Sequence, residues 1–376
     1  KNSGFYEDTL KSKLWHNIKF ENKFIRNLHP VKGGTGPYGP NMHFLSNRNF
    51  DVENDTIFNV EIPNDINSTD LTKIDTEVAE LFVFAIKNLL KKTSLSSSQI
   101  KAIGSHGQTI KHSPNNIKPF SLQIGNPQVI KNLTTITTIS DFRSADILAG
   151  GEGAPLAPLF HKAIFGNNKD KNVIINIGGI ANITFLNFDN KEVFGYDIGP
   201  GNCLMDAWIR INKNLDFDSE GTWAKDGQFI RELLDLMLED EFIKRKVPKS
   251  TGPDYFNINW IQEKLNTLNK NPDNKDVQAT LLELTSESIC CELRKYLQSI
   301  HKIFICGGGI HNRFLIRNIE KKINKKVFSS LNFGIHPDFV EAICFAWLAR
   351  ERMKKHSFDL SEITGSKGKV LLGKIW

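Results

Sequence analysis

The stretch from residue 173 to residue 202 constrains the fold of this chain more than any other. Residues 173–186 read Val-Ile-Ile-Asn-Ile-Gly-Gly-Ile-Ala-Asn-Ile-Thr-Phe-Leu, two apolar runs that are separated by Gly178 and Gly179. Polar turn residues follow, and a third run, Val-Phe-Gly-Tyr-Asp-Ile, contains Asp197. Apolar, β-branched runs of this length are typical of buried strands, and clustered polar residues are typical of turns. We therefore predict strand, glycine turn, strand, polar turn and strand, with Asp197 at the mouth of the third strand.

The glycine pair and the aspartate indicate a functional site. Adjacent glycines expose backbone N–H groups with no side chain in the way, which suits the close approach of a phosphate. A carboxylate such as Asp197 can then act as a base or hold a metal ion. The alternative is a tight hairpin with a surface aspartate, and for Gly178 and Gly179 alone it is equally good. The Gly-Pro-Gly-Asn segment at residues 199–202 favours the functional interpretation.

Length and composition predict a two-domain globular protein. At 376 residues and 42.6 kDa, the chain is long enough to form two cores. We place the boundary near residue 155, which gives a first α/β domain of residues 1–155 and a second of residues 156–376. No apolar run reaches the ~18 residues that a membrane span needs. Residues 1–23 are polar and mixed in charge and do not read as a signal peptide.

The cysteines, histidines and charges argue against several classes of protein. The five cysteines form no C-x-x-C pair and are odd in number, which argues against a disulfide framework or a structural zinc site and favours a reducing cytoplasm. The ten histidines show no metal-ligand spacing. The net charge of +6 is spread along the chain, so we expect neither nucleic acid nor a membrane as a partner.

Regular elements are predicted from about residue 70 onward, and residues 1–60 are the least regular part of the chain. There, residues 33–40 (Gly-Gly-Thr-Gly-Pro-Tyr-Gly-Pro) could cradle a phosphate, but no apolar strand precedes them and a plain loop is favoured. We expect a flexible crossing between the domains at residues 150–153. The periodicities predict helices at residues 70–92, 157–165, 204–211 and 276–300, and strands at residues 100–104, 120–124, 134–139 and 302–306.

Two polar side chains in the first half are candidates for ligand binding. His106 follows the predicted strand at residues 100–104, and the carboxyl ends of strands are where open α/β sheets bind ligands. Arg143 offers a planar fork for a carboxylate or a phosphate. Each has a plainer interpretation, because His106 could be a hydrogen-bonded turn residue and Arg143 could pair with Asp141 or Asp146.

A triple glycine and a later glutamate provide two more candidates. Gly307, Gly308 and Gly309 lie between a predicted strand and a helix start, where a flat ring or a phosphate can rest against bare backbone at a positive helix end. The spacing is not G-x-G-x-x-G, so the dinucleotide-binding fingerprint is not met. Glu341 begins an otherwise apolar helical run. It could complement the helix dipole or belong to a site.

Several blocks in a fixed order identify a resemblance to a known family. Over roughly residues 70–376 the sequence strongly resembles the anhydro-N-acetylmuramic acid kinases, and agreement of many blocks is more specific than any single motif. The blocks are His106-Gly-Gln-Thr109, Gly151-Glu-Gly-Ala-Pro155, Asn176-Ile-Gly-Gly-Ile-Ala-Asn182, Gly195-Tyr-Asp-Ile-Gly-Pro-Gly-Asn202, Lys249-Ser-Thr-Gly252, Asp276-Val-Gln-Ala-Thr280, Cys306-Gly-Gly-Gly309 and Glu341-Ala-Ile-Cys-Phe-Ala-Trp347.

The resemblance implies a fold and a reaction. It implies an α/β protein with the actin-like sugar-kinase fold, in which two RNase H-like domains close on a cleft. It implies that ATP and Mg²⁺ are used to phosphorylate O6 of 1,6-anhydro-N-acetylmuramic acid while water opens the anhydro ring. The product would be N-acetylmuramic acid 6-phosphate, formed in cell-wall (peptidoglycan) recycling. A homodimer is also implied.

The resemblance further implies roles for individual residues. Asp197 would be the general base that activates the water. No metal ligand is identified. Phosphate and nucleotide contacts would come from Gly178, Gly179, Gly307, Gly308 and Gly309, and the sugar pocket would be lined by His106, Arg143 and Glu341.

One departure from the family pattern motivates a second hypothesis. Family members begin with a Met-Ser-Gly-Thr-Ser-x-Asp-Gly phosphate loop, and residues 1–60 contain no such block. The alternative is a catalytically impaired protein that binds nucleotide or amino sugar without phosphoryl transfer. A third hypothesis, an RNase H-like nuclease, requires carboxylates for two metal ions. Its only candidates are Asp141, Asp146 and Asp197.

Overall fold

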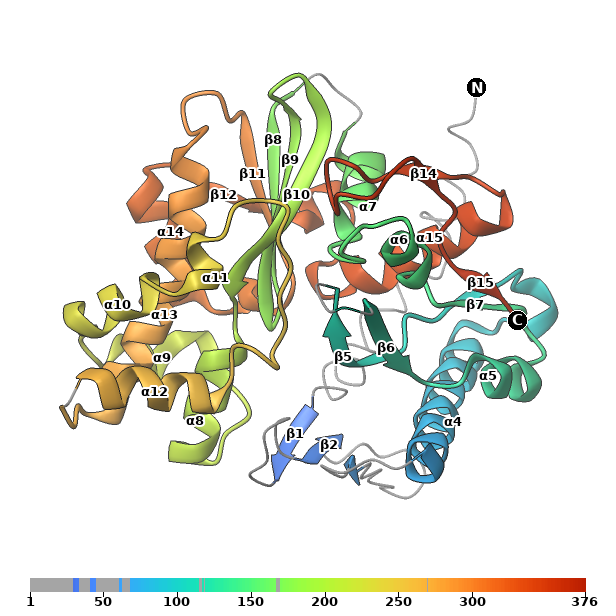
Figure 1. Ribbon diagram of the computed structural model, residues 1–376, viewed down its shortest axis with the longest axis horizontal. Coiled ribbons are helices and arrows are strands. Elements are labelled where there is room, and N and C mark those ends of the chain that lie inside the picture. Colours follow the sequence, from blue (N-terminus) through green and yellow to red (C-terminus); the bar gives the residue numbers. More distant parts are fainter. Residues whose placement is uncertain are drawn as a thin grey trace.

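The computed structural model describes residues 71–114, 117, 119–166, 170–268 and 270–376. It also gives the backbone of residues 68–70 and of three short strands, β1 (Pro30–Gly33), β2 (Asn41–Phe44) and β3 (Glu61–Ile62). The expectations for the loop at residues 33–40 and for the first phosphate loop therefore fall outside the described residues. The described chain forms two halves that lie side by side (Figure 1). Residues 71–165 together with residues 340–376 form the first half, and residues 172–329 form the second half.

The second half is built on a five-stranded sheet with the order β10-β9-β8-β11-β12. Neighbours pair antiparallel from β8 to β10 and parallel from β8 to β12. In chain order this is 3-2-1-4-5, the order of an RNase H-like domain, so the predicted α/β class and sheet type are confirmed. The strands are β8 (Asn172–Ile177), β9 (Ile180–Phe188), β10 (Lys191–Pro200), β11 (Lys302–Cys306) and β12 (Val327–Ser329).

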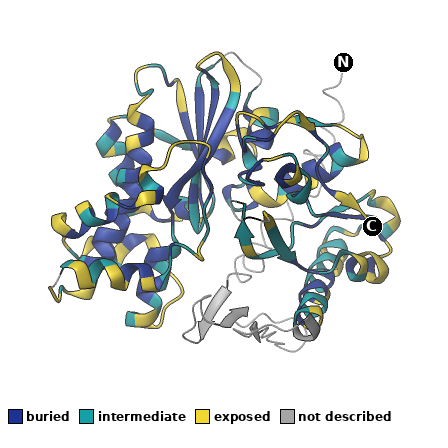
Figure 2. Cartoon of the chain, in the orientation of Figure 1, coloured by how far each residue is buried: buried dark blue, intermediate teal, exposed yellow. Residues whose placement is uncertain are grey.

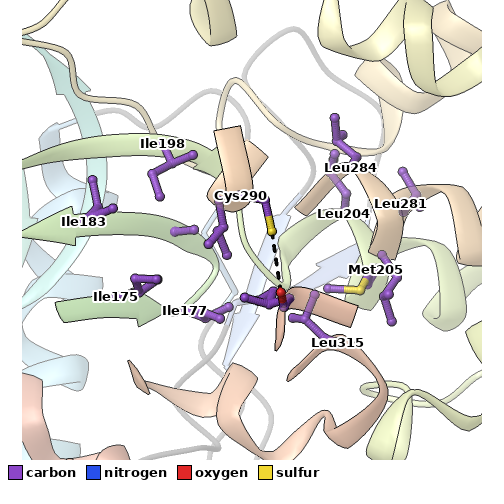
Figure 3. Close-up of a cluster of buried hydrophobic side chains, with 14 of the residues drawn as sticks. Ile175, Ile177, Ile183, Ile198, Leu204, Met205, Leu281, Leu284, Cys290 and Leu315 are labelled. Atoms are coloured by element: carbon purple, nitrogen blue, oxygen red, sulfur yellow. Dashed lines mark hydrogen bonds between the residues drawn. The ribbon is translucent and has the colours of Figure 1, made fainter. Parts of the chain in front are cut away.

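Both faces of this sheet are buried, as its continuous apolar runs predict. On β8, Val173, Ile175 and Ile177 belong to one core, whereas Ile174 belongs to a second core on the opposite face. Figure 2 shows these strands buried along most of their length, and Figure 3 shows part of the first core. That core is completed by residues of α8 (Cys203–Lys213), α9 (Thr222–Lys225), α10 (Arg231–Leu238), α11 (Glu241–Lys244), α12 (Ile258–Leu268), α13 (Asn274–Arg294) and α14 (Arg313–Ile323).

The first half contains a small sheet, a hairpin and helices. β4 pairs parallel with β7, and β5 pairs antiparallel with β6. Among the described residues, none of the helices is both long enough and apolar enough to span a membrane. The elements are α4 (Ser68–Thr93), β4 (Ile103–Gly104), β5 (Gln108–Ser113), β6 (Phe120–Ile124), α5 (Pro127–Thr134), β7 (Thr138–Ser140), α6 (Ser144–Leu148) and α7 (Ala157–Phe165).

The end of the chain returns to the first half. β15 (Lys374–Ile375) pairs antiparallel with β7, and the Trp376 indole N–H donates to Ser140 Oγ at 2.8 Å. α15 (Val340–Met353) packs against β4 and contributes to the same core as β7, and β13 (Phe358–Asp359) pairs with β14 (Lys369–Val370). The domain division at residue 155 stays a prediction. It assigns residues 340–376 to the second domain, whereas in the structure β15 pairs with β7 and α15 packs against β4 of the first half.

Most predicted elements are present, and three need correction. The helices near residues 70–92, 157–165 and 204–211 and the strands at 120–124 and 302–306 are confirmed. The strand predicted at residues 134–139 is wrong before Thr138, where β7 begins. The Asn126 side chain caps α5, which runs to Thr134 before a left-handed Thr135 ends it. The other predicted strand in this half, residues 100–104, is a strand only over β4. The long helix ends at Arg294 instead of near residue 300.

The predicted flexible crossing at residues 150–153 is also wrong. Gly151, Glu152 and Gly153 are buried. The Glu152 N–H donates to Thr364 O at 2.9 Å, and the Gly153 N–H donates to Asp146 Oδ2 at 2.7 Å. These bonds fix a glycine-rich segment that composition alone predicts to be mobile.

The buried central strand generates a stability prediction. Ile175→Ala should lower the free energy of unfolding by about 2–5 kcal/mol, since it opens a cavity beside a fully buried side chain. Ile211→Ala, on the outer face of α8 where the side chain is 50% exposed, should change it by less than about 0.5 kcal/mol. Urea unfolding followed by circular dichroism measures both. Equal losses in the two variants would contradict the assignment of the core.

Candidate active site

Asp197 lies on β10 and faces away from the core of the second half. Its neighbours Tyr196 and Ile198 both belong to that core, so the alternation of the strand turns Asp197 toward the first half. The side chain is only 6% exposed. Its Oδ2 accepts a hydrogen bond from the Thr251 N–H at 3.0 Å, and its own N–H donates to Lys249 O at 3.2 Å.

The surroundings of Asp197 give it an unusual acidity. Burial raises the pKa of its carboxyl from 3.8 to about 7, and the negative charge of Glu152 acts in the same direction. The Thr251 N–H and the positive charges of Arg143 and Lys249 oppose this rise. A carboxyl with a pKa near neutrality is present in both forms at pH 7, so it can accept a proton during a reaction and release it afterwards.

Arg143 is held by neutral partners and not by an ion pair. Its Nε donates to His106 Nε2 at 3.0 Å, and its Nη1 donates to Gly153 O at 2.6 Å. The plainer interpretation of Arg143 as the partner of an aspartate does not apply. Asp141 pairs with Lys374, and Asp146 accepts from Thr364 and from Gly153. The guanidinium is therefore oriented while its charge remains available.

His106 packs against α15, the helix that carries Glu341. The His106 ring packs on Phe345 of α15 with ring centroids 4.3 Å apart, and Glu341 lies one turn earlier on that helix. Burial and the charge of Arg143 hold the pKa of His106 well below its ordinary value, so the imidazole is neutral. Glu341 keeps solvent-accessible surface, but the protein atoms around it raise the pKa of its carboxyl, while Arg143 acts in the opposite direction.

The structure thus brings together four of the predicted site residues. Glu341 and Asp197 are the two groups whose negative charges act most strongly on Arg143, and Arg143 is bonded to His106. They come from four segments: the end of β4, the start of α6, the strand β10 and the start of α15. His106 is hydrogen-bonded, as its plainer interpretation requires, and the donor of that bond is Arg143.

Gly178 and Gly179 form the turn between β8 and β9. The Gly178 O accepts from the Asn202 N–H and the Gly179 O accepts from the Gly201 N–H, both at 2.8 Å. A Cβ added at Gly178 or Gly179 would meet no atom closer than 3.5 Å. The fold itself therefore tolerates a side chain at both positions, and the open backbone there is available to a ligand.

The three glycines after β11 differ from one another. Gly307 has φ +81°, and a Cβ there would lie 2.5 Å from Asn176 Oδ1; one at Gly309 would lie 2.3 Å from Ile177 Cγ2. Gly308 is exposed, and its nearest neighbour would be Asn202 Nδ2 at 3.9 Å. Gly307 and Gly309 are thus required by the fold, whereas Gly308 is open. Gly308 and Gly309 begin a short 3₁₀ turn that runs to His311, and α14 begins at Arg313.

Several polar residues beside Asp197 are not among the candidate site residues named from the sequence. Asn176, Asn182 and Asp197 lie opposite one another on β8, β9 and β10 and form a polar row across the sheet. Asn182 Oδ1 is buried and has no hydrogen-bond partner among the described residues. Glu152 and Ser250 contact each other at 2.6 Å. The motifs around Glu152 and Ser250 stand out in the sequence, but nothing in their spacing of 98 residues predicts the contact.

The carboxylate cluster of a nuclease is not formed by the part of the chain that the structure describes. There, no three His, Cys, Asp or Glu side chains are grouped to hold a metal ion. Asp141 and Asp146 are engaged by Lys374 and by Thr364. The nuclease hypothesis therefore finds no metal site among the described residues.

The fold and the site together are typical of a nucleotide-dependent phosphotransferase, in which open backbone at glycine turns faces a buried base. The family model for anhydro-N-acetylmuramic acid kinase matches residues 51–376. An anhydro-N-acetylmuramic acid kinase of Coxiella burnetii (strain RSA 493 / Nine Mile phase I) is 44% identical over 306 residues, covering 80% of this chain and 81% of that protein. One of Legionella pneumophila (strain Corby) is 40% identical over 316 residues, covering 83% and 85%. The chain belongs to the anhydro-N-acetylmuramic acid kinase family.

A solved structure with a more distant likeness is the activator of the 2-hydroxyisocaproyl-CoA dehydratase from Clostridium difficile with bound ADPNP. It is 14% identical and covers 81% of this chain and 91% of its own, with a TM-score of 0.37. This likeness is too low to bear on function.

The contrast between open and required glycines generates a prediction. Gly308→Ala should leave thermal stability unchanged and weaken ATP binding, because the new methyl group occupies space that only a ligand would use. Gly307→Ala should lower the free energy of unfolding by about 1–3 kcal/mol or more, because the residue needs a left-handed conformation and would meet Asn176. Calorimetric unfolding and titration with ATP measure both. ATP binding by Gly308→Ala at the wild-type affinity would contradict the assignment.

Proposed function

We propose that this protein is an ATP-dependent sugar kinase that phosphorylates O6 of 1,6-anhydro-N-acetylmuramic acid while water opens the anhydro ring. The product is N-acetylmuramic acid 6-phosphate, which places the reaction in peptidoglycan recycling. Family membership supports the substrate and the reaction. The structural observation that supports the mechanism is the buried Asp197, whose carboxyl has a pKa of about 7. Neither the relatives nor the described site favours the alternative of an impaired protein.

The reaction requires one base and one phosphoryl acceptor. Asp197 takes a proton from water as the water oxygen forms a bond with C1 of the sugar. The C1–O6 bond breaks, and O6 takes the γ-phosphoryl group as its bond to the β-phosphate oxygen of ATP breaks, releasing ADP. A positioned base contributes about 10²–10⁴-fold to such a step. Holding water, sugar and ATP in line supplies much of the remaining acceleration.

Arg143, His106 and Glu341 would bind the sugar. Two of the five N–H donors of the Arg143 guanidinium are used by His106 and Gly153. The remaining donors can bind a sugar oxygen or a carboxylate in a fixed orientation. A neutral His106 suits this role, because it accepts from Arg143 without adding a competing positive charge. Glu341 can accept hydrogen bonds from sugar hydroxyl groups.

The nucleotide phosphates would lie on the open glycines Gly178, Gly179 and Gly308. Backbone at these positions can approach an anion without moving a neighbouring atom. Among the described residues, no three His, Cys, Asp or Glu side chains are grouped to hold a metal ion. The phosphate oxygens of ATP would therefore carry the Mg²⁺ ion, which neutralises phosphate charge when it is bound.

Three further expectations are proposals: the homodimer, which the resemblance implies, the cytoplasmic location, which the cysteine content favours, and the domain boundary near residue 155, which the sequence pattern indicates. Light scattering during gel filtration tests the first of these, with twice the 42.6 kDa chain mass as the expected result.

The proposed base generates a prediction for turnover. In a coupled ATPase assay with 1,6-anhydro-N-acetylmuramic acid, the wild-type protein should release ADP only when the sugar is present. Asp197→Asn should lower kcat by about 10²–10⁴-fold, because an amide of the same size cannot take the proton. The matched control is Asp235→Asn on the exposed face of α10, which should behave as wild type. Sugar-dependent turnover that persists in Asp197→Asn would refute the assignment, and its absence from the wild type would refute the function.

The acidity of Asp197 generates a prediction for pH. The carboxylate form is required, so kcat/KM, which reports the ionisation of the free enzyme, should rise about tenfold per pH unit below a midpoint near pH 7 and level off above it. The free energy of unfolding should instead fall as the pH rises. The pKa of this group is raised in the folded state from an unfolded value of about 3.9, so its ionisation costs stability increasingly from about pH 4 to 7 and by a constant amount above. Asp197→Asn should therefore raise the melting temperature most above pH 7 and little at pH 4. A gain that does not vary with pH would contradict the raised pKa.

A further inference from the structure

The backbone of residues 249–251 holds Asp197 from two sides. Lys249 O accepts from the Asp197 N–H, and the Thr251 N–H donates to the Asp197 carboxylate. Lys249 and Ser250 are both buried, and Lys249 Nζ donates to two backbone carbonyls of the same half at 3.0 and 3.3 Å. The orientation of the Asp197 carboxylate therefore depends on where this three-residue segment lies.

Ser250 anchors that segment to the first half. Its Oγ donates to Glu152 Oε2 at 2.6 Å. Glu152 is only 8% exposed, its backbone N–H is bonded to Thr364 O, and its other carboxylate oxygen accepts from Arg245. Glu152 is thus a fixed point in the first half that holds a segment of the second half.

A second set of hydrogen bonds reaches Ser250 from the hairpin of β5 and β6. His112 Nε2 lies 3.3 Å from Ser250 Oγ, and His112 Nδ1 lies 2.9 Å from Ser121 Oγ. The Ser250 hydroxyl gives its only proton to Glu152, so it accepts from Nε2–H, and Nδ1 accepts from Ser121. Burial, with the charge of Arg143, lowers the pKa of His112 to about 4, so the neutral imidazole that this arrangement needs is the form present at pH 7.

We propose that Glu152 is a positioning residue for Asp197 and acts on it in two separable ways. Through Ser250 it fixes the backbone N–H that orients the Asp197 carboxylate, and through its negative charge it opposes ionisation of Asp197. The catalytic consequence rests on the proposed function, in which Asp197 is the base.

The charges around Asp197 support the second of these effects. Arg143 at the start of α6 and Lys249 are positive and favour the carboxylate form of Asp197. Glu152 is the negative group that acts against them. Without Glu152 these two positive groups, and Arg245 with which Glu152 forms an ion pair, would be unopposed, and Asp197 would ionise at a lower pH. A base that ionises too readily binds a proton weakly, so its driving force for taking the proton from water falls.

Two substitutions separate the two effects. Ser250→Ala removes the link and keeps the charge, so kcat should fall about tenfold to a hundredfold, as for a small misplacement of a catalytic group, with the midpoint of the pH profile unchanged. Glu152→Gln keeps an acceptor for Ser250 and removes the charge, so the midpoint should move below pH 7 while the plateau value of kcat stays within about threefold of wild type. The matched control is Glu192→Gln, an exposed partner of Lys162, which should change neither quantity.

A measurement without turnover keeps this inference distinct from the proposed function. The gain in melting temperature of Asp197→Asn is followed against pH in the wild-type and Glu152→Gln backgrounds, which reports the ionisation of Asp197 in the folded protein. The midpoint should lie lower in the Glu152→Gln background. An unmoved midpoint overturns the charge effect, and kcat of Ser250→Ala within twofold of wild type overturns the link. A moved midpoint in a protein without sugar-dependent turnover upholds the action of Glu152 on Asp197 and refutes the kinase function.

Discussion

The site depends on one buried carboxylate that the protein stabilises only in part. Moving an ionised carboxylate out of water costs several kcal/mol unless hydrogen bonds and opposite charges compensate for the lost hydration. Asp197 receives one backbone N–H and the attraction of Arg143 and Lys249, while Glu152 repels it. The balance leaves its pKa near 7. More compensation would produce an ordinary ionised aspartate, and less would produce a permanently protonated one.

The packing of the two halves brings together the groups that set the pKa of Asp197. The sheet of the second half is packed on both faces, so it presents Asp197 on a rigid strand. The charges that act on Asp197 come partly from outside that sheet: Arg143 and Glu152 lie in the first half. Glu341, whose charge acts on Arg143, arrives on α15 after the chain has left the second half. The return of the C-terminal segment to β7 is therefore part of how the site is assembled. Local packing around Asp197 alone would not produce it.

What the sequence could predict follows the range of the interactions. The strands around Gly178 and Asp197 were predictable because their pattern is local, and the α/β class followed from them. The contact of Glu152 with Ser250 was not, because it joins residues 98 positions apart. The segment at residues 150–153 reads as flexible from its glycines, yet hydrogen bonds to Asp146 and Thr364 fix it. Composition describes what a segment can do alone, and tertiary contacts decide what it does.

The glycines show the same limit most clearly. All five candidates look equivalent in the sequence, but the space around them separates two kinds. Gly307 and Gly309 are held by the fold, because a side chain would strike Asn176 or Ile177. Gly178, Gly179 and Gly308 have room that the fold leaves unused. Unused room beside a backbone that could carry a side chain needs an explanation outside the folded chain itself, and an anion lying on that backbone provides one. The three open glycines are therefore stronger candidates for phosphate contacts than Gly307 and Gly309, which the fold itself requires.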